Sequence, residues 1–288
     1  MVDFGRLLTA MVTPFNDQLE VDFEAATKLI DHLVQTGTET LVVGGTTGES
    51  PTLSKDEKIA LFRHVVKEAK GKAKVIAGTG SNNTQASIEL TRAAEEVGVD
   101  GIMLVVPYYN KPSQEGLYQH FKAIAESTSL PVMLYNIPGR SAINMSVETI
   151  LRLAEVPNIT SVKEASGDLS AAAFIVDKAP EGFKVYSGDD KLTLPIMSVG
   201  GHGIVSVASH VIGKEIKEMV QAFVEGNVSV ASSLHRKYLP IFEGLFITSN
   251  PVPVKYALQQ MGVQVGSVRL PLVSVNPQEA KFIDSLFQ

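Results

Sequence analysis

The 288-residue chain contains no cysteine and no tryptophan, and aromatic residues make up only 7% of it. Without cysteine there can be no disulfides, thiol nucleophiles or thiolate metal sites, and this absence fits a reducing compartment. The N-terminus lacks the basic start and unbroken apolar stretch of a signal peptide. No segment approaches the ~20 apolar residues of a membrane span. We therefore expect a cytoplasmic protein with no membrane partner.

Charged residues are also few, at 19% of the chain. Lys and Arg total 25 against 31 Asp and Glu, which gives a net charge of −6. The basic residues form no stripe or patch, so the sequence predicts no nucleic-acid partner. Hydrophobic residues make up 44% of the chain, which is typical of a globular protein with a large core.

Short β-rich apolar runs recur through the first three quarters of the chain and are mostly apolar on both faces, as in buried parallel strands. They begin at Leu7, Thr40, Lys74, Gly101, Pro131, Ile159, Phe183 and Gly203. Amphipathic helical patterns separate them and begin at Asp22, Ser54, Asn83 or Thr84, Ser113 and Ser146, with a capping box at Ser54.

Eight strand–helix units predict a (β/α)8 TIM barrel over residues 1–224, and the helical patterns of residues 225–288 predict a C-terminal helical appendage packed on it. An open doubly wound sheet is the alternative, but no GxGxxG motif follows the first strand.

Polar side chains gather where the predicted strands end, which is where barrel enzymes keep their chemistry. The segments are TTGES from Thr46, PYYN from Pro107, YNIPGR from Tyr135, KEAS from Lys163 and SGDD from Ser187. We expect Asp189 and Asp190 to be solvated helix caps. Glu49 is interpreted as an anchor that accepts loop N–H bonds.

Lys163 is the candidate nucleophile. Alternation places it on the same face as Ile159 and Ser161 and opposite Glu164. Desolvation among small and apolar neighbours would lower its pKa, and a neutral amine can form a Schiff base with a carbonyl compound. A solvated or ion-paired lysine is the alternative.

Four further residues suit the same chemistry. Tyr135 is a candidate proton carrier, with hydroxyl partners at Thr46 and Tyr109. Arg140, which we place on a Pro-Gly loop, could hold a carboxylate through two parallel hydrogen bonds. A core tyrosine and a surface arginine are the alternatives.

The segments GTTGES, PYYNKPSQEGLYQHF, LYNIPGR, ITSVKEASGD and SGDD, in this order, resemble the pyruvate-dependent class I aldolases, the family of dihydrodipicolinate synthase and N-acetylneuraminate lyase. The resemblance runs from TAMVTPF to the C-terminal helices. It implies condensation of pyruvate with L-aspartate 4-semialdehyde to 4-hydroxy-tetrahydrodipicolinate, the first committed step of the diaminopimelate route to lysine.

The resemblance also implies residue roles. Lys163 would form the Schiff base, and Tyr135 would relay protons with Thr46 and Tyr109. The pyruvate pocket would be formed by Thr47, Val205 and Gly188, and Arg140 would bind the semialdehyde carboxylate. No metal or organic cofactor is expected. Tyr109 would reach into a neighbouring subunit, which implies a homodimer, commonly paired into a homotetramer.

Some relatives are inhibited by lysine, and the resemblance places that site at Ser50, Lys55, Lys58, Asn82, Ala86 and Tyr108. Lysine-inhibited members often carry histidines and a carboxylate where this chain has Lys55, Lys58 and Ala86. Because two cations would repel an ammonium ligand, we expect weak or absent inhibition by lysine.

Other functions remain open at this point. A different pyruvate-dependent aldolase, such as a sialic-acid or 2-keto-3-deoxy sugar acid lyase, would share the lysine and differ in the second substrate. A retaining glycosidase would need Glu49 and Glu164 facing each other, and a metal-dependent aldolase would need clustered histidines. A non-catalytic barrel that only binds ligands is the alternative from a different class.

Overall fold

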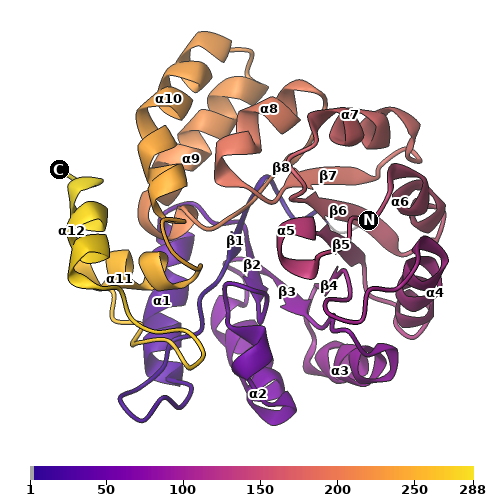
Figure 1. Ribbon diagram of the computed structural model, residues 1–288, viewed down its shortest axis with the longest axis horizontal. Helices are drawn as coiled ribbons and strands as arrows, with labels where there is room; N and C mark the ends of the chain where they lie inside the picture. The colour runs from indigo at the N-terminus through magenta and orange to yellow at the C-terminus, as the bar shows by residue number, and fades with distance from the viewer. Residues whose placement is uncertain (1–2) are drawn as a thin grey trace.

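A closed barrel of parallel strands forms the centre of the computed structural model, which describes residues 3–288 (Figure 1). Each strand pairs with the next in the chain, and β8 pairs with β1 to close the ring. The strands are β1 (Leu7–Ala10), β2 (Thr40–Val43), β3 (Lys74–Gly78), β4 (Gly101–Val105), β5 (Val132–Asn136), β6 (Ile159–Glu164), β7 (Lys184–Ser187) and β8 (Gly203–Ser206). The predicted TIM barrel is confirmed, and the open sheet is wrong.

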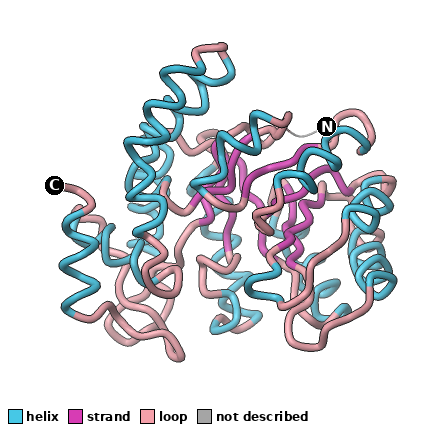
Figure 2. Tube along the Cα trace, turned by 45° about the horizontal axis from the view of Figure 1, so that its top comes forward, coloured by secondary structure: helices cyan, strands magenta, loops and turns pink. Residues whose placement is uncertain are grey.

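Helices surround the strands in both ribbon and tube views (Figures 1 and 2). Those between or after the strands are α1 (Phe23–Gln35), α2 (Lys55–Ala69), α3 (Thr84–Val97), α4 (Gln114–Ala125), α5 (Pro138–Ser141), α6 (Val147–Ala154), α7 (Leu169–Lys178), α8 (Thr193–Ser198) and α9 (Ser209–Val224). Two 3₁₀ helices, η1 (Ser50–Thr52) and η2 (Asp190–Leu192), follow β2 and β7.

Five of these helices are capped by residues at which the sequence predicts a helix to begin. The side chains of Asp22, Ser54, Asn83, Ser113 and Ser146 each accept a hydrogen bond from a backbone N–H in the first turn. Such a bond satisfies one of the amides that a helix N-terminus leaves unpaired. The local sequence thus fixes where these helices start.

The barrel has two apolar layers. Side chains such as Leu8, Ile76 and Met133 form an inner cluster, whereas their neighbours Leu7, Val75 and Leu134 belong to an outer cluster between strands and helices. This follows from the alternation of side chains along a strand. The inner cluster therefore closes the floor below any site at the mouth.

The last three helices lie outside the ring: α10 (Val228–Gly244), α11 (Val252–Gln260) and α12 (Pro277–Ser285) (Figure 1). Helix α10 packs against α9 and η2, and α11 packs against α9 and α12. The segment between α10 and α12 reaches back to the loop after β2, as described below.

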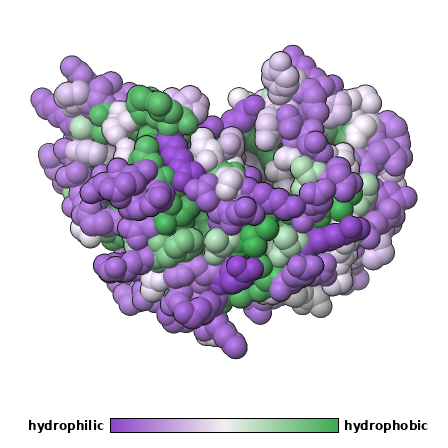
Figure 3. All heavy atoms as spheres, turned by 90° about the horizontal axis from the view of Figure 1, so that it is seen from below, coloured by the Kyte–Doolittle hydropathy of each residue, from purple (hydrophilic) through white to green (hydrophobic). Residues whose placement is uncertain are grey.

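Hydrophilic side chains predominate on the face shown in Figure 3, with hydrophobic ones gathered between them. Within residues 3–288, no helix combines the length and the apolar character needed to cross a bilayer.

Candidate active site

Lys163 lies inside the barrel at the C-terminal end of β6, with only 4% of its surface exposed. In the strand register it stands between Tyr135 of β5 and Tyr186 of β7. Its ammonium nitrogen sits 4.1 Å from the centre of the Tyr135 ring. Burial lowers the pKa of Lys163 to about 7; the charge of Asp190 opposes this shift and that of Arg140 adds to it. Part of the amine is therefore uncharged at neutral pH.

Tyr135 is 3% exposed and belongs to the inner cluster. Burial raises the pKa of Tyr135 to about 12, while a hydrogen bond with Thr46 and the charge of Arg140 act in the opposite direction. The phenol therefore keeps its proton and can donate it to a group bound beside Lys163. Thr46 and Tyr135 both line the cavity described below.

Gly188 follows β7 and packs directly on the lysine. A Cβ at this position would lie 2.6 Å from the Cβ of Ala165 and 3.2 Å from the Cε of Lys163. The Gly188 N–H also donates to the Glu164 carbonyl at 2.7 Å. Only glycine leaves the lysine side chain its space at this point. Val205, the other predicted pocket residue, lies on β8 in the inner cluster.

The prediction for Asp190 is wrong. Asp189 does cap η2, but Asp190 is only 2% exposed. Its carboxylate accepts hydrogen bonds from the Ser206 hydroxyl and from the N–H groups of Val207 and Ala208, the latter two at 3.0 Å. Adjacent carboxylates at a helix start are typically solvated, and the sequence alone did not show that the chain after β8 folds over this one.

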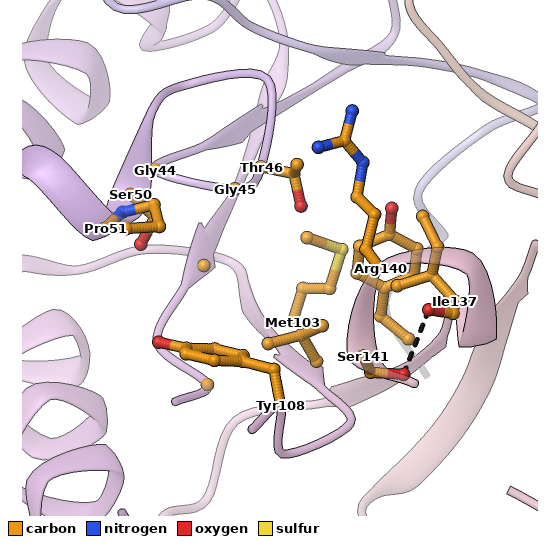
Figure 4. Close-up of a pocket in the computed structure, with 14 residues that line it drawn as sticks. Gly44, Gly45, Thr46, Ser50, Pro51, Met103, Tyr108, Ile137, Arg140 and Ser141 are labelled. Carbon is orange, nitrogen blue, oxygen red and sulfur yellow. Dashed lines mark hydrogen bonds between the residues drawn. The ribbon is translucent and has the colours of Figure 1, made fainter. Parts of the chain in front are cut away.

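A cavity of about 250 Å³ opens at the mouth of the barrel (Figure 4); Lys163 is not among its lining residues but lies against the ring of Tyr135, which is. Thr46, Tyr135 and Arg140 contribute to its wall, and Tyr108 lies across the opposite end. The remaining lining residues are Gly44, Gly45, Ser50, Pro51, Gly78, Gly80, Met103, Val105, Ile137 and Ser141. Apolar walls with a few convergent polar groups are typical of small-molecule sites.

Arg140 is exposed and directs its guanidinium toward the same space as the Thr46 hydroxyl (Figure 4). It lies in the short helix α5 rather than on a loop, which corrects the prediction. Pro138 begins this helix, a position where its fixed φ angle and missing N–H are tolerated. A helical turn holds the arginine backbone more firmly than a loop would.

The loop after β2 is tied down from several sides. Thr47 is 3% exposed, and its hydroxyl oxygen accepts a hydrogen bond from Asn250 Nδ2 at 2.9 Å. Glu49 adopts a left-handed backbone conformation with φ of 56°, which is strained for a residue with a side chain. Its carboxylate accepts from Lys255 Nζ at 2.8 Å and from the Arg269 N–H at 2.9 Å. Glu49 is therefore an anchor, although its partners come from the C-terminal region.

Tyr109 does not join the other relay residues within this chain. It is 88% exposed and has φ of 73°, a second strained position. A strained backbone holding a large aromatic side chain in solvent is unusual, because apolar surface favours burial.

The residues of the predicted lysine site lie in different surroundings. Ser50 and Tyr108 line the cavity, and Asn82 Nδ2 donates to the Tyr108 carbonyl at 3.1 Å. Lys55 is not a free cation, because it pairs with Glu89 at 3.1 Å. Lys58 is partly buried, which lowers its pKa. Ala86 lies exposed on α3.

The glycosidase geometry is absent. Val162, the neighbour of Lys163, packs in the outer cluster. Glu164 is buried and accepts from Asn136 Nδ2 at 3.0 Å and from the Ser166 N–H at 2.6 Å. Both its oxygens are thus engaged in holding the strand ends together.

Asn250 was missed by the sequence reasoning, because it lies outside the barrel motifs and nothing local marks it as part of the site.

A partly uncharged lysine at the C-terminal mouth of a (β/α)8 barrel, next to a protonated tyrosine, defines a barrel of the Schiff-base-forming class. The model of the dihydrodipicolinate synthetase family matches residues 3–288. The chain belongs to this family.

Named relatives agree with this assignment. A 4-hydroxy-tetrahydrodipicolinate synthase of Halalkalibacterium halodurans is 61% identical, over 98% of this chain and 96% of the relative. The Bacillus subtilis protein of the same name is 58% identical, over 99% and 98%. A Bacillus anthracis dihydrodipicolinate synthase structure superposes with a TM-score of 0.98 at 57% identity, covering 99% of this chain and 98% of that one. The lysine-bound enzyme of Cyanidioschyzon merolae has a TM-score of 0.97 at 48% identity, covering 99% and 97%.

Proposed function

We propose that this protein is a lyase of the class I aldolase type that condenses pyruvate with L-aspartate 4-semialdehyde to give 4-hydroxy-tetrahydrodipicolinate, in the diaminopimelate route to lysine. The observation that carries the proposal is the buried Lys163, whose pKa of about 7 leaves a nucleophilic amine at neutral pH.

The first half of the reaction activates pyruvate. Lys163 Nζ attacks the keto carbon and one of its own protons passes to the carbonyl oxygen; Tyr135 donates a second proton, so that this oxygen leaves as water. The resulting iminium draws electrons from the adjacent methyl group, which loses a proton to become an enamine. In this proposal the Thr47 hydroxyl and the backbone near Gly188 and Val205 hold the pyruvate carboxylate.

The second half forms the carbon–carbon bond. The enamine carbon attacks the aldehyde carbon of the semialdehyde, whose carboxylate pairs with Arg140, and the new alkoxide takes a proton. The amino group of the same substrate then attacks the iminium carbon, closes the ring and releases Lys163 as a free amine. In these steps Tyr135 and Thr46 donate and accept the protons that are transferred.

Two measurements test the proposal. Borohydride reduction in the presence of pyruvate is expected to add a pyruvyl mass to the peptide that carries Lys163, and an unmodified peptide would favour a non-catalytic barrel. A coupled assay then compares pyruvate plus aspartate semialdehyde with pyruvate plus N-acetylmannosamine. Faster turnover of the sugar would favour the sialic-acid lyase alternative.

The proposal includes a homo-oligomer, a dimer or a tetramer, in which Tyr109 completes the relay of a neighbouring subunit. Its support is the strained backbone that holds this side chain outward. Sedimentation at decreasing concentration, followed in parallel with activity, tests this: the relay predicts that activity falls as the oligomer dissociates.

We also propose that lysine inhibits weakly or not at all. Its support is Lys58 on α2, a partly buried lysine at a position that the family resemblance assigns to the lysine site, where a cation would repel an ammonium ligand. Strong inhibition at low lysine in a steady-state titration would contradict this.

A further inference from the structure

Asn250 lies at the junction of the C-terminal region and the barrel mouth. It is 6% exposed, and its side-chain amide bonds to Thr47 of the loop after β2. Its main-chain carbonyl is 3.5 Å from Arg140 Nη2, a long hydrogen bond. Asn250 thus touches both residues that the proposed function assigns to binding substrate carboxylates.

Asn250 does not cap a helix, which is a common role of asparagine. It precedes α11, but the N-cap of that helix is Pro251, and no side chain caps the helix. Its Oδ1 atom is buried and, within residues 3–288, accepts no hydrogen bond. A buried acceptor without a partner destabilises the fold, so such groups are rare in native proteins and often belong to functional sites.

The direction of the bond to Thr47 has a chemical consequence. A hydroxyl group has one proton to donate and two lone pairs that accept. Asn250 Nδ2 occupies one lone pair of Thr47 Oγ1, which leaves the hydroxyl proton free to be donated elsewhere. Had Thr47 faced an acceptor instead, its proton would be taken and its lone pairs would repel an incoming carboxylate.

We propose that Asn250 is a positioning residue that orients the Thr47 hydroxyl as a donor to the carboxylate of the keto acid. It acts through Thr47 and contacts no reacting atom. The inference rests on the proposed function, because it takes the bound anion to be the carboxylate of pyruvate. It predicts that changes at Asn250 alter the affinity for pyruvate more than the chemical steps.

The test compares Asn250→Leu and Asn250→Asp with Asn227→Asp as control. Leucine approximates the shape of asparagine and removes the unpaired acceptor, so it tests function without leaving a buried polar group. Aspartate offers Thr47 an acceptor and reverses the direction of the bond. Asn227 is an exposed asparagine before α10 with no side-chain cap bond, so its variant adds the same charge outside the cavity.

The measured quantity is the pyruvate concentration at half-maximal borohydride trapping on Lys163, which needs no second substrate. We expect it to rise about tenfold for Asn250→Leu and more, up to about a hundredfold, for Asn250→Asp, because hydrogen bonds to charged groups have effects of this size. Trapping at saturating pyruvate should stay within about threefold of the parent. The KM for the aldehyde should move less, since the main-chain carbonyl near Arg140 remains.

A double-mutant cycle separates this role from a general structural one. In a Thr47→Val background, adding Asn250→Leu should raise the half-saturating pyruvate concentration by less than about twofold. Equal effects with and without Thr47, or unchanged pyruvate affinity in both Asn250 variants, would overturn the proposal. If Asn250→Leu does not fold, Asn250→Ser takes its place in the same cycle. Failure of the parent to trap pyruvate would instead sink the proposed function.

Discussion

Two lysines are buried within residues 3–288, Lys163 and Lys255, and their surroundings differ in one decisive respect. Lys255 of α11 donates to Glu49 at 2.8 Å and to the Ser267 carbonyl at 2.7 Å. Lys163 lies over the Tyr135 ring, and within the described part of the chain no hydrogen bond engages its ammonium nitrogen. Burial lowers both pKa values, to about 8 for Lys255 and about 7 for Lys163.

Burial alone therefore does not make a lysine nucleophilic. The Lys255 ammonium is neutralised by a carboxylate, so its free energy is lowest when it stays charged and paired. Only the charge of Asp190 favours the ammonium form of Lys163, so this lysine gives up its proton more readily and has a lone pair available for attack. One lysine therefore joins the C-terminal region to the barrel, and the other is free to react.

The strongest test replaces each lysine by arginine. Lys163→Arg removes the only proposed nucleophile, because a guanidinium stays protonated and cannot form the imine. We expect loss of turnover by at least about a thousandfold and no pyruvyl adduct, as found when enzyme nucleophiles are removed. Lys255→Arg keeps the charge beside Glu49 and should still trap pyruvate. Parental turnover by Lys163→Arg would refute the assignment.

The second prediction concerns the contribution of Lys255 to the stability of the fold. Lys255→Met leaves the Glu49 carboxylate buried without its cation, which should lower the free energy of unfolding by about 3–5 kcal/mol. Urea unfolding at pH 7 measures this. Adding Glu49→Gln removes the unpaired charge and should restore at least half of the loss. If the double variant is as unstable as Lys255→Met, packing rather than charge explains the effect.

The pH dependence of trapping sharpens the same contrast. With a pKa of about 7, the neutral fraction of Lys163 rises almost tenfold per pH unit below 6.5 and levels off above pH 8. The initial rate of pyruvate trapping, measured with cyanoborohydride, should follow this curve, a change of about fiftyfold between pH 5 and 7. A rate that keeps rising to pH 10 would show an ordinary lysine.

Much of this arrangement could be predicted from the sequence because it is local. Strand alternation places Lys163 inward and Val162 outward, and single capping residues such as Ser54 and Asn83 start their helices. What could not be predicted depends on contacts between distant segments. Asn250 reaches Thr47 and Lys255 reaches Glu49 across some 200 residues of chain, and neither contact has a pattern in the sequence around it.

The prediction that Asp190 is solvated was wrong for the same reason. The N–H groups that donate to its carboxylate belong to Val207 and Ala208, just after the following strand, β8, ends at Ser206. A pair of aspartates after a strand gives no local sign that one of them is enclosed. Reactive groups are therefore easier to identify from the sequence than the residues that hold them in place.

The last prediction concerns a gain in stability. The folded state holds Lys163 at a pKa of about 7, against 10.5 for an unperturbed lysine, so below pH 10.5 the unfolded state binds more protons. The resulting destabilisation is complete below about pH 7 and disappears as the pH rises to 10.5. Lys163→Met, which fills the same space without a charge, should therefore raise the free energy of unfolding by up to about 4 kcal/mol at pH 7 and by less than about 1 kcal/mol at pH 10. Urea titrations at both pH values check this, and a destabilised Lys163→Met at pH 7 would mean that this lysine, like Lys255, is held by a partner.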